Sequence, residues 1–546
     1  MKSPSPTPDE RGHTRRDADA SPKRGRGIAQ AATIVSLGNI ASRVFGLIRD
    51  NRNFYYFGAT GSMSAFEAAS LVPRNMYELL VGGMVSAALV PVFSQYASKE
   101  ESDELWDVLS VVLSLVVVSA CGLLLLAEGA APLLSKTLVG GFDAELQRLT
   151  TVLIRIISPA VIFFGVSGVL TAALYAQQVF AYPAIGAAVF NLGGILGTQL
   201  LARRIGISSL TFGIVFGAFL QMAVQVPGLR QARIRFSLNW RHPALRRIVT
   251  LYLPVVLSLV VSQIGIVVDR NLASRVGEQT IAWMASATRL REFPLGLVST
   301  AVSMAVLPAL SRIDLQTGRS EFKETLGLGL RLVLFLIIPA AVGLFVLAEP
   351  VIALIFQHGQ FTALDTQQAA RALSGYLLGT PFAAADLLLI FAFYSQKDTV
   401  TPVLVGIVCV LVFVTVAPTL AFGLGWGMIG LVVANSVQLT CHALIMFAVL
   451  HRRIGELEGE HLATSIAKIL LGSVVMGAAV HLSLFVMRSA VPGPAILPRA
   501  LRIAAAGLAG LITYGISMSV LRVSEARLLS NMLLRRAQNR HRAQEP

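Results

Sequence analysis

Uncharged apolar runs of about twenty residues or more follow one another along nearly the whole chain. A helix that crosses the hydrocarbon core of a bilayer, which is about 30 Å thick, needs about 20 such residues. Only 14% of the 546 residues are charged and 55% are hydrophobic, whereas about 25% of a soluble domain is charged. The chain is therefore predicted to be an all-α integral membrane protein.

The polar breaks between the apolar runs predict fourteen transmembrane helices. Each break is a short stretch in which charged residues, glycine or proline return. The expected ranges are 28–50, 63–95, 104–134, 147–175, 181–202, 207–227, 245–272, 280–311, 324–356, 366–395, 400–422, 426–450, 464–487 and 499–522.

Three groups of residues recur in the second half of the chain at nearly constant offsets of 219, 219 and 217. The recurring sets are Tyr175, Gln177 and Pro183 as Tyr394, Gln396 and Pro402; Asp50 and Gly58 as Asp269 and Gly277; and Arg74, Val85, Ser86, Ala88 and Pro91 as Arg291, Val302, Ser303, Ala305 and Pro308. Agreement between the offsets indicates two related lobes of six helices, followed by a separate helix pair. Since six is even, both lobes enter the membrane in the same direction and a pseudo-two-fold axis would run along the membrane normal, as in transporters that alternate their access.

This repeat sets the expected domain boundaries. They are a disordered tail at 1–26, an N-lobe at 27–229, a C-lobe at 230–453, a helix pair at 454–525 and a second basic tail at 526–546. The first tail is rich in Pro, Ser, Arg and Asp and has little apolar surface to bury.

The distribution of basic residues predicts the orientation. An even helix count leaves both termini on one side, and the tails and the loop from Arg230 to Arg247 hold many of the Lys and Arg residues. Loops on the other side, such as 357–365 and 422–426, have few or none. Because basic residues concentrate on the cytoplasmic side, both termini should be cytoplasmic. The same distribution explains the net charge of +15 without a nucleic-acid partner.

Residues for bond-making chemistry do not form a recognisable set. Cys121, Cys409 and Cys441 lie far apart in apolar runs, and His481 is the only histidine predicted to lie well inside one. No nucleophile triad, phosphate loop or glycine fingerprint is present. The chain is therefore predicted to be a transporter without a bound cofactor, rather than an enzyme.

Charged residues in the first two helices of each lobe are the candidate site. A charge at bilayer depth costs about 2.5 to 3.5 kcal/mol on insertion scales, so such residues normally face a wet cavity or a partner. The set comprises Arg43, Arg49, Asp50, Arg74 and Glu78 in the first half and Asp269, Arg270, Arg289, Arg291 and Glu292 in the second. For Arg49, Asp50, Asp269 and Arg270, interfacial residues that reach toward the headgroups are an equally good interpretation. Arginines that converge from both lobes would suit a diphosphate, which guanidinium groups bind in a bidentate way.

Proline and glycine in two of these helices are candidate hinges. They are Pro73, Gly82, Gly83, Pro294 and Gly296. Neighbouring helices can satisfy the backbone groups that such residues leave free. Ordinary packing of small residues in membrane helices remains the alternative.

Four short motifs lie in the charged helices. Ser42 to Asp50 reads SRVFGLIRD and Ser86 to Pro91 reads SAALVP, while Arg289 to Gly296 reads RLREFPLG and Leu307 to Ser311 reads LPALS. Together with the helix count, they resemble the MurJ (MviN) family of lipid II flippases, part of the multidrug/oligosaccharidyl-lipid/polysaccharide (MOP) exporter superfamily. The resemblance extends from about residue 27 to residue 524.

This resemblance implies a mechanism and a substrate. Two lobes would alternate access to a central cationic cavity, moving undecaprenyl-diphosphate-linked peptidoglycan precursor (lipid II) to the outer leaflet while helices 13 and 14 hold its tail. The resemblance makes Arg43, Arg49 and Arg289 the essential arginines, Asp50 and Glu292 the accompanying acids, and Asp269 a sodium ligand. Sodium or the membrane potential would drive transport, and the protein would lie in the inner membrane of a bacterial cell.

The chain departs from the family pattern at several positions. Tyr77 and Glu78 stand where the family has two arginines, Gly82 where it has a glutamate, and Ser64 and Thr288 where it has aspartates. Helix 11 contains no Asn or Asp, which argues against the sodium site. Arg74 could supply the missing positive charge, one turn from Tyr77.

These departures leave two alternatives open. One is a flippase for another polyprenyl-diphosphate-linked glycan. The other is a membrane scaffold that no longer transports and instead recruits cell-wall synthesis enzymes through its basic tails. A cation exporter of the same superfamily is disfavoured, because its cavity would need acidic residues.

Overall fold

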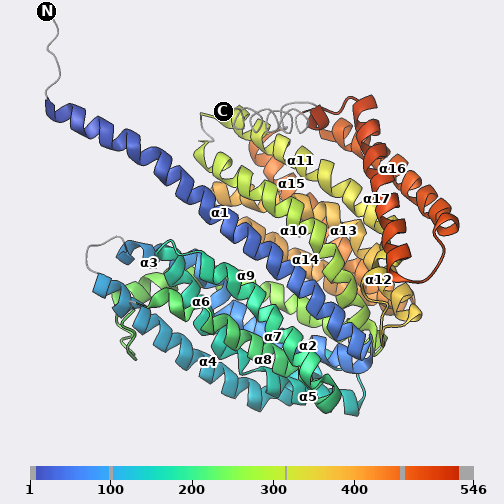
Figure 1. Ribbon diagram of the computed structural model, residues 1–546, viewed down its shortest axis with the longest axis horizontal. Helices are drawn as coiled ribbons and strands as arrows, with labels where there is room; N and C mark the ends of the chain where they lie inside the picture. Colours follow the sequence, from blue (N-terminus) through green and yellow to red (C-terminus); the bar gives the residue numbers. More distant parts are fainter. Residues whose placement is uncertain (1–7, 98–101, 231, 314–316, 456–461, 528–546) are drawn as a thin grey trace, which may run out of the picture. The chain divides into compact units, whose positions relative to one another are not determined.

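The computed structural model describes residues 8–97, 102–230, 232–313, 317–455 and 462–527 (Figure 1). These described residues form helices joined by short turns and contain no strand. In chain order the elements are α1 (Pro8–Phe57), α2 (Gly61–Tyr77), η1 (Glu78–Gly82), η2 (Val85–Leu89), α3 (Val90–Ala97), α4 (Ser102–Val139), α5 (Ala144–Ile157), α6 (Ala160–Ala176), α7 (Ala181–Ile205), α8 (Ser208–Ala223), η3 (Val226–Leu229), α9 (Pro243–Val276), α10 (Thr280–Arg312), α11 (Arg319–Val346), α12 (Ala348–Ile355), α13 (Ala363–Ser395), α14 (Val400–Pro418), η4 (Thr419–Gly423), α15 (Met428–Ile454), α16 (Leu462–Ala490) and α17 (Ile496–Val520).

Eleven helical spans in the described part of the chain are long and apolar enough to cross a membrane. Three further long helices, α1, α9 and α10, fall on the remaining three predicted ranges. Helices suit this chain because hydrocarbon offers no water to backbone N–H and C=O groups, which each helix satisfies internally. The prediction of an all-α, multi-pass membrane protein is confirmed.

The N-terminal tail differs from the sequence prediction. Helix α1 begins at Pro8, so residues 8–26 are helical where a disordered tail was expected. Most of the predicted C-terminal tail, from residue 528 onward, lies outside the described residues.

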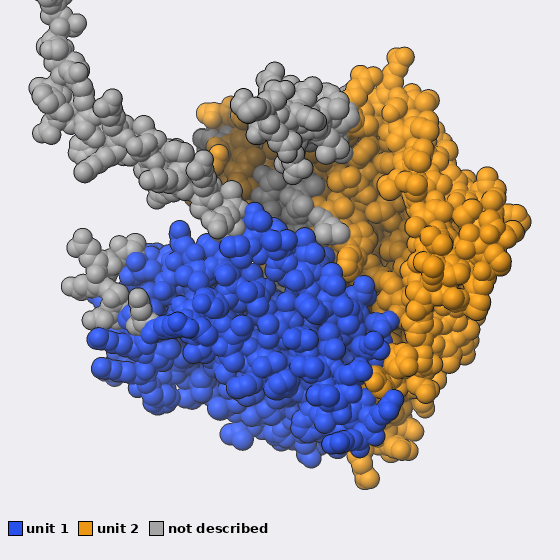
Figure 2. Space-filling view, viewed as in Figure 1, with its two compact units in different colours: residues 1–53, 69–134, 150–259 blue, residues 54–68, 135–149, 260–546 orange. Residues whose placement is uncertain are grey.

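The chain divides into two compact units, coloured in Figure 2. Unit 1 comprises residues 1–53, 69–134 and 150–259, and unit 2 comprises residues 54–68, 135–149 and 260–546. The predicted lobes had a single boundary at residue 230. The division differs because residues 54–68 and 135–149 hydrogen-bond within unit 2. Examples are the bonds from Gln360 N–H to Tyr55 O (3.0 Å), from Ala282 N–H to Ser64 Oγ (3.1 Å) and from Gly141 N–H to Ser274 Oγ (3.0 Å).

Each unit has an apolar core of its own. In unit 1, Val81, Phe93 and Leu109 are fully buried together with Tyr252 of α9, which explains why the first half of α9 belongs there. In unit 2 the core joins α10, α11, α13, α15, α16 and α17. Outward-facing leucines of α4, including Leu125 and Leu126, are 72% and 69% exposed, as expected for side chains that meet lipid tails.

The sequence repeat reappears as identical local geometry. After Tyr175 the chain turns through Gln178 at a φ of 61°, and after Tyr394 it turns through Lys397 at a φ of 60°. The N–H groups of Gln178 and Lys397 donate to the carbonyls of Tyr175 and Tyr394, at 3.0 and 2.9 Å. In each turn, a glutamine side chain also donates to the carbonyl four residues earlier. A left-handed residue is uncommon outside glycine, so its recurrence at an offset of 219 supports a duplication.

Candidate functional site

In unit 1 the charged part of α1 lies against α7 through a row of polar contacts. Asn191 Nδ2 donates to the backbone and hydroxyl oxygens of Ser42, at 3.0 and 3.3 Å. Further along, Thr198 Oγ1 donates to Asn53 Oδ1 at 2.8 Å. Between these contacts, a Cβ on Gly194 would come within 2.7 Å of Arg49 Cδ. Gly194 therefore leaves the space that Arg49 occupies.

Arg49 and Asp50 form an ion pair inside this row. Nε and Nη2 of Arg49 donate to Asp50 Oδ1 at 3.0 and 2.8 Å, and the two side chains are 17% and 9% exposed. The guanidinium also lies 5.8 Å from the centre of the Phe190 ring. Both residues thus have partners inside the protein, and the contacts favour a structural contribution for the pair.

Arg43 and Arg74 are held differently. Arg43 is half-buried on α1, and Arg74 is exposed in the last turn of α2. Neither side chain makes a hydrogen bond or ion pair with another described residue. Both guanidinium groups keep their hydrogen-bond donors for a ligand or for water.

The predicted hinge at Gly82 and Gly83 is irregular in the structure. Two π-helical turns, η1 and η2, separate α2 from α3, and Glu78 opens the first of them. The Tyr252 hydroxyl lies 3.0 and 2.8 Å from the carbonyls of Glu78 and Leu79. Such turns inside helices often occur at functional sites. By contrast, α10 continues as an α-helix through Pro294 and Gly296, and bending at both hinges stays a prediction.

A polar cluster in unit 2 contains Asp269 and Arg270 of α9 and Arg291 of α10. Arg291 Nη1 donates to Asn435 Oδ1 at 3.2 Å, and its guanidinium lies 4.9 Å from the Tyr376 ring centre. The buried atoms Asp269 Oδ1, Arg270 Nε and Nη1, and Arg291 Nε have no hydrogen-bond partner among the described residues. Unpaired buried polar atoms are rare in proteins and are costly inside a membrane protein, so this cluster is a strong candidate for function.

The charges around Asp269 do not suit sodium. Arg270 and Arg291 are the charged groups that act on its carboxylate, and two guanidinium groups would repel a cation. In the described residues, no group of three or more His, Cys, Asp or Glu side chains could hold a metal ion. The donors that the structure places near Asp269 therefore do not fit the sodium site that the resemblance implied.

Arg289 and Glu292 are separated by their contacts. Arg289 Nη2 lies 3.5 Å from Glu67 Oε2, and the two side chains are 30% and 10% exposed. Glu292 is exposed and makes no hydrogen bond or ion pair with another described residue. Arg289 therefore pairs with Glu67 of α2 rather than with the acid three residues away on its own helix.

Several buried polar residues were missed by the sequence analysis. His442 Nδ1 lies 2.7 Å from Asp386 Oδ1, in the middle of α15 and α13. The prediction that His481 is the only histidine well inside an apolar run was wrong, since His442 also lies in one. Glu67 was visible as a lone acid in the apolar run from Gly61 to Val72. A third pair, Arg331 with Glu525 at 2.7 Å, joins residues too far apart in sequence to be paired by spacing.

An apolar cavity of about 740 Å³ lies between α11, α16 and α17, all in unit 2. Phe335, Met476 and Val480 line it, and the Tyr514 hydroxyl donates to the Phe335 carbonyl at 2.8 Å. A Cβ on Gly515, or on the nearby Gly507, would meet no atom within 4 Å. These glycines keep open the groove predicted for helices 13 and 14.

Comparison with known proteins decides the family. A family model described as "Lipid II flippase MurJ" matches residues 54–497. The chain belongs to this family. A probable lipid II flippase MurJ from Vibrio cholerae is 30% identical over 441 residues, covering 78% of this chain and 83% of the relative. The lipid II flippase MurJ of Burkholderia cenocepacia is 29% identical over 438 residues, covering 78% and 84%.

Solved structures agree with the membership in the MurJ family. A lipid II flippase MurJ structure in an inward closed conformation matches with a TM-score of 0.75 and 26% identity, over 90% of this chain and 99% of that one. A multidrug resistance MATE family transporter of the MOP superfamily matches with a TM-score of 0.64 and 16% identity, over 76% and 94%. The second match shows the fold alone, which MurJ and MATE proteins share. The family predicted from the motifs is confirmed.

Proposed function

We propose that this MurJ-family protein flips lipid II from the cytoplasmic to the outer leaflet by alternating access, with Arg43 and Arg289 binding its diphosphate and Arg49 stabilising α1 through its pair with Asp50. The observation that carries the proposal is the membership in the MurJ family together with arginines at these three motif positions. Peptidoglycan synthesis would consume the product on the outer face.

The contacts of the arginines suit reversible binding of a diphosphate. Arg43 has no partner among the described residues, and Arg289 lies 3.5 Å from the Glu67 carboxylate, longer than the 2.7–2.9 Å of a strong charge-assisted bond. Each guanidinium has five N–H donors in a planar fork that matches phosphate oxygens. A diphosphate could therefore compete with Glu67 for Arg289 and leave again after transport.

The apolar groove suits the lipid part of the substrate. Its volume is about 740 Å³, and burying a methylene group contributes about 0.8 kcal/mol. A polyprenyl tail that lies along α16 and α17 would stay in an apolar environment while the headgroup crosses. Helices α16 and α17, the pair predicted to follow the two lobes, would then bind the lipid tail.

The membrane potential is the proposed driving force. Sodium is disfavoured by the arginines beside Asp269. Lipid II is anionic, and moving one negative charge outward across an inside-negative membrane gains about 2.3 kcal/mol per 100 mV. The concentration of basic residues in the tails and in the loop from Arg230 to Arg247 supports cytoplasmic termini and a position in the bacterial inner membrane.

Complementation of a strain depleted of its own lipid II flippase tests this proposal. The wild type should restore growth, and the triple variant Arg43→Ala, Arg49→Ala, Arg289→Ala should not, at equal protein level in the membrane. The matched control replaces three exposed arginines in the last turns of α7 and α15, Arg203→Ala, Arg204→Ala and Arg452→Ala, and should still grow. Growth of the first triple variant would favour a scaffold that does not depend on these arginines.

Filling the groove tests the role of helices α16 and α17. Gly515→Leu places a side chain in open space, so the fold should tolerate it while the tail loses room and complementation weakens. Gly129→Leu in α4 is the matched control, because a Cβ there also meets nothing within 4 Å. Equal growth of both variants would contradict the proposed tail site.

A further inference from the structure

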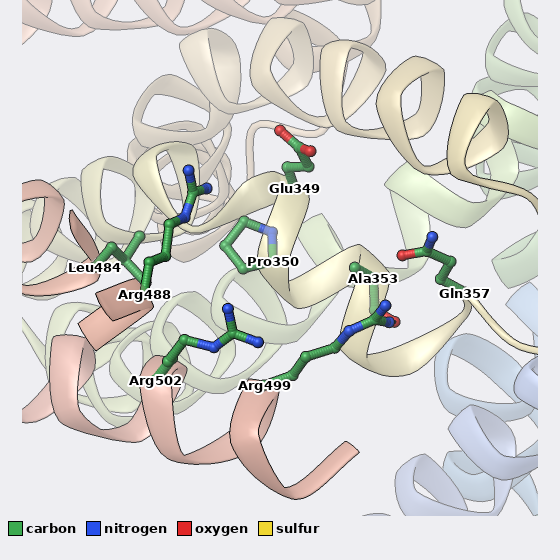
Figure 3. A pocket seen from close by; sticks show the side chains of 8 residues that line it. All are labelled: Glu349, Pro350, Ala353, Gln357, Leu484, Arg488, Arg499 and Arg502. Carbon is green, nitrogen blue, oxygen red and sulfur yellow. The ribbon is translucent and has the colours of Figure 1, made fainter. Parts of the chain in front are cut away.

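A second, smaller cavity lies at the other end of the α16 and α17 pair from the apolar groove. Its volume is about 150 Å³, and it is bounded by the last turn of α16, the first turns of α17 and the short helix α12. Figure 3 shows Arg488 of α16 and Arg499 and Arg502 of α17 reaching toward α12. Glu349 and Gln357 line the α12 side.

The three guanidinium groups keep their positive charge unneutralised. Arg499 Nη1 donates to Ala353 O at 3.1 Å, and Arg502 donates to the carbonyls of Pro498 and Gly493, at 3.2 and 2.6 Å. Arg488 makes no hydrogen bond with the described residues, and none of the three forms an ion pair with Glu349 or another described acid. Backbone carbonyls thus fix two guanidinium groups in place without cancelling their charge, and most of their donors remain available.

The sequence places these arginines where general electrostatics disfavours them. From residue 488 to residue 502 the chain contains three arginines and no acid. Arg499 lies in the first turn of α17, whose N-cap residue Ala495 supplies no side-chain cap, and a cation there opposes the helix dipole. In the proposed orientation this end of the helices also faces outward, where basic residues are normally scarce. An anionic ligand would offset each of these costs.

Size and surroundings indicate what kind of anion fits. A cavity of about 150 Å³ is comparable with one that holds a benzene molecule, so it admits a phosphate with its ester linkage rather than a glycopeptide. Large apolar side chains close in sequence to Arg488 and Arg499, namely Leu482 and Phe485 of α16 and Ile496 and Leu497 of α17, are 60–69% exposed. They are positioned to contact lipid tails, so an anion bound here would have an apolar part beside it.

We propose that Arg488, Arg499 and Arg502 form a binding site for the phosphate of a membrane lipid, separate from the transport cavity. The assignment to the outer leaflet rests on the proposed orientation, whereas the binding itself does not depend on transport. Two lipids carry this chemistry there: an anionic phospholipid with a phosphodiester, and a polyprenyl diphosphate. Either would place its phosphate among the arginines and its chains against α16 and α17.

The test uses the full-length protein in phosphatidylcholine nanodiscs and measures binding of a fluorescent phosphatidylglycerol. We expect saturable binding that the triple variant Arg488→Gln, Arg499→Gln, Arg502→Gln weakens by at least about tenfold, since charge-assisted hydrogen bonds to the phosphate are lost; tenfold corresponds to about 1.4 kcal/mol. The control variant Arg203→Gln, Arg204→Gln, Arg452→Gln removes the same charge elsewhere and should bind as the wild type does. Arg488→Gln alone removes no hydrogen bond within the described protein, so its smaller loss of binding tests the site without disturbing the fold.

Competition identifies the source of the phosphate. If unlabelled phosphatidylglycerol displaces the probe and undecaprenyl diphosphate does not, the site binds a phospholipid. If undecaprenyl diphosphate displaces the probe and phosphatidylglycerol does not, the site binds a polyprenyl diphosphate. Displacement by inorganic phosphate but by neither lipid would overturn the lipid assignment. Equal probe binding by the wild type and by both arginine variants of this site would overturn the proposal, whatever the outcome of complementation.

Discussion

Asp50 and Asp269 occupy equivalent positions of the sequence repeat, yet their surroundings differ. Asp50 accepts two hydrogen bonds from Arg49 at 3.0 and 2.8 Å. Asp269 has a buried Oδ1 with no partner among the described residues, and it lies near Arg270 and Arg291, which also have unpaired nitrogens. The duplication thus kept the aspartate but not its contacts. One copy contributes to stability, and the other leaves polar groups unpaired in the way that functional sites do.

Among the variants that test this comparison, removal of Arg291 should change the free energy of unfolding most. Arg291→Ala takes away the bond to Asn435, the contact with the Tyr376 ring and a positive charge beside Asp269. Leaving buried polar groups unpaired costs about 1–3 kcal/mol, so we expect a loss of stability of about 2–3 kcal/mol in denaturant unfolding of the protein in detergent. A change below about 0.5 kcal/mol would show that the cluster does not depend on Arg291.

Comparing Arg49 with Arg43 separates stability from transport within α1. Arg49→Gln breaks the pair with Asp50 and should lower the unfolding free energy by about 1–2 kcal/mol. Arg43→Gln removes no contact with the described residues and should change it by less than about 0.5 kcal/mol, while complementation is still lost. If Arg43→Gln destabilises the protein as much as Arg49→Gln does, the assignment of the two roles is wrong.

Arg289 and Glu67 should show a weaker coupling than Arg49 and Asp50. Their atoms are 3.5 Å apart and Arg289 is 30% exposed, so solvent screens the pair and about 0.5–1 kcal/mol is expected. A double-mutant cycle with Arg289→Gln and Glu67→Gln, read out by unfolding, measures it. Coupling above about 2 kcal/mol would mean that Glu67 holds Arg289 too tightly for exchange with a diphosphate.

The last comparison concerns the repeated turns. Asp398 of the second turn takes the place of Val179 in the first. Partial burial raises the pKa of Asp398, but hydrogen bonds from Thr401 and Arg453 and the charge of Arg453 outweigh this and lower the pKa to about 2. Because the folded pKa is depressed, the contribution of Asp398 is present above its unfolded pKa of about 3.9. The contribution is lost as the pH falls toward 2.

Asp398→Asn should therefore destabilise the protein at pH 6 and make little difference near pH 2. The measurement is the difference in unfolding free energy between this variant and the wild type across that range. Val179→Asn in the first turn is the matched control and should show no such pH dependence. An Asp398→Asn effect that is the same at both pH values would rule out the ion pair with Arg453 as its cause.

The sequence predicted the positions of the helices better than it predicted the contacts between side chains. Apolar runs fixed the helix positions because hydrocarbon tolerates few charges, and all fourteen predicted ranges fall on helices. The repeat predicted two related halves, and the matching turns at Gln178 and Lys397 agree with it. The division into units could not be read in the same way, because it depends on where residues such as Ser64 and Ser274 find hydrogen-bond partners.

The partners of the charged residues were the hardest part to predict. Arg289 pairs with Glu67 on α2 rather than with Glu292, which lies three residues along its own helix. His442 and Asp386 are 56 residues apart and meet only because α13 packs on α15. Spacing along one helix predicts which side chains share a face, whereas contacts between helices depend on packing that single positions do not reveal.

The most direct test of the account is the appearance of lipid II on the outer face of cells depleted of their own flippase. An impermeant reagent that labels or cleaves the exposed headgroup measures it. Re-expression of this protein should restore labelling, and the double variant Arg43→Ala, Arg289→Ala at the same membrane level should leave lipid II inside. Labelling by that variant equal to the wild type would contradict the claim that these arginines carry the substrate across.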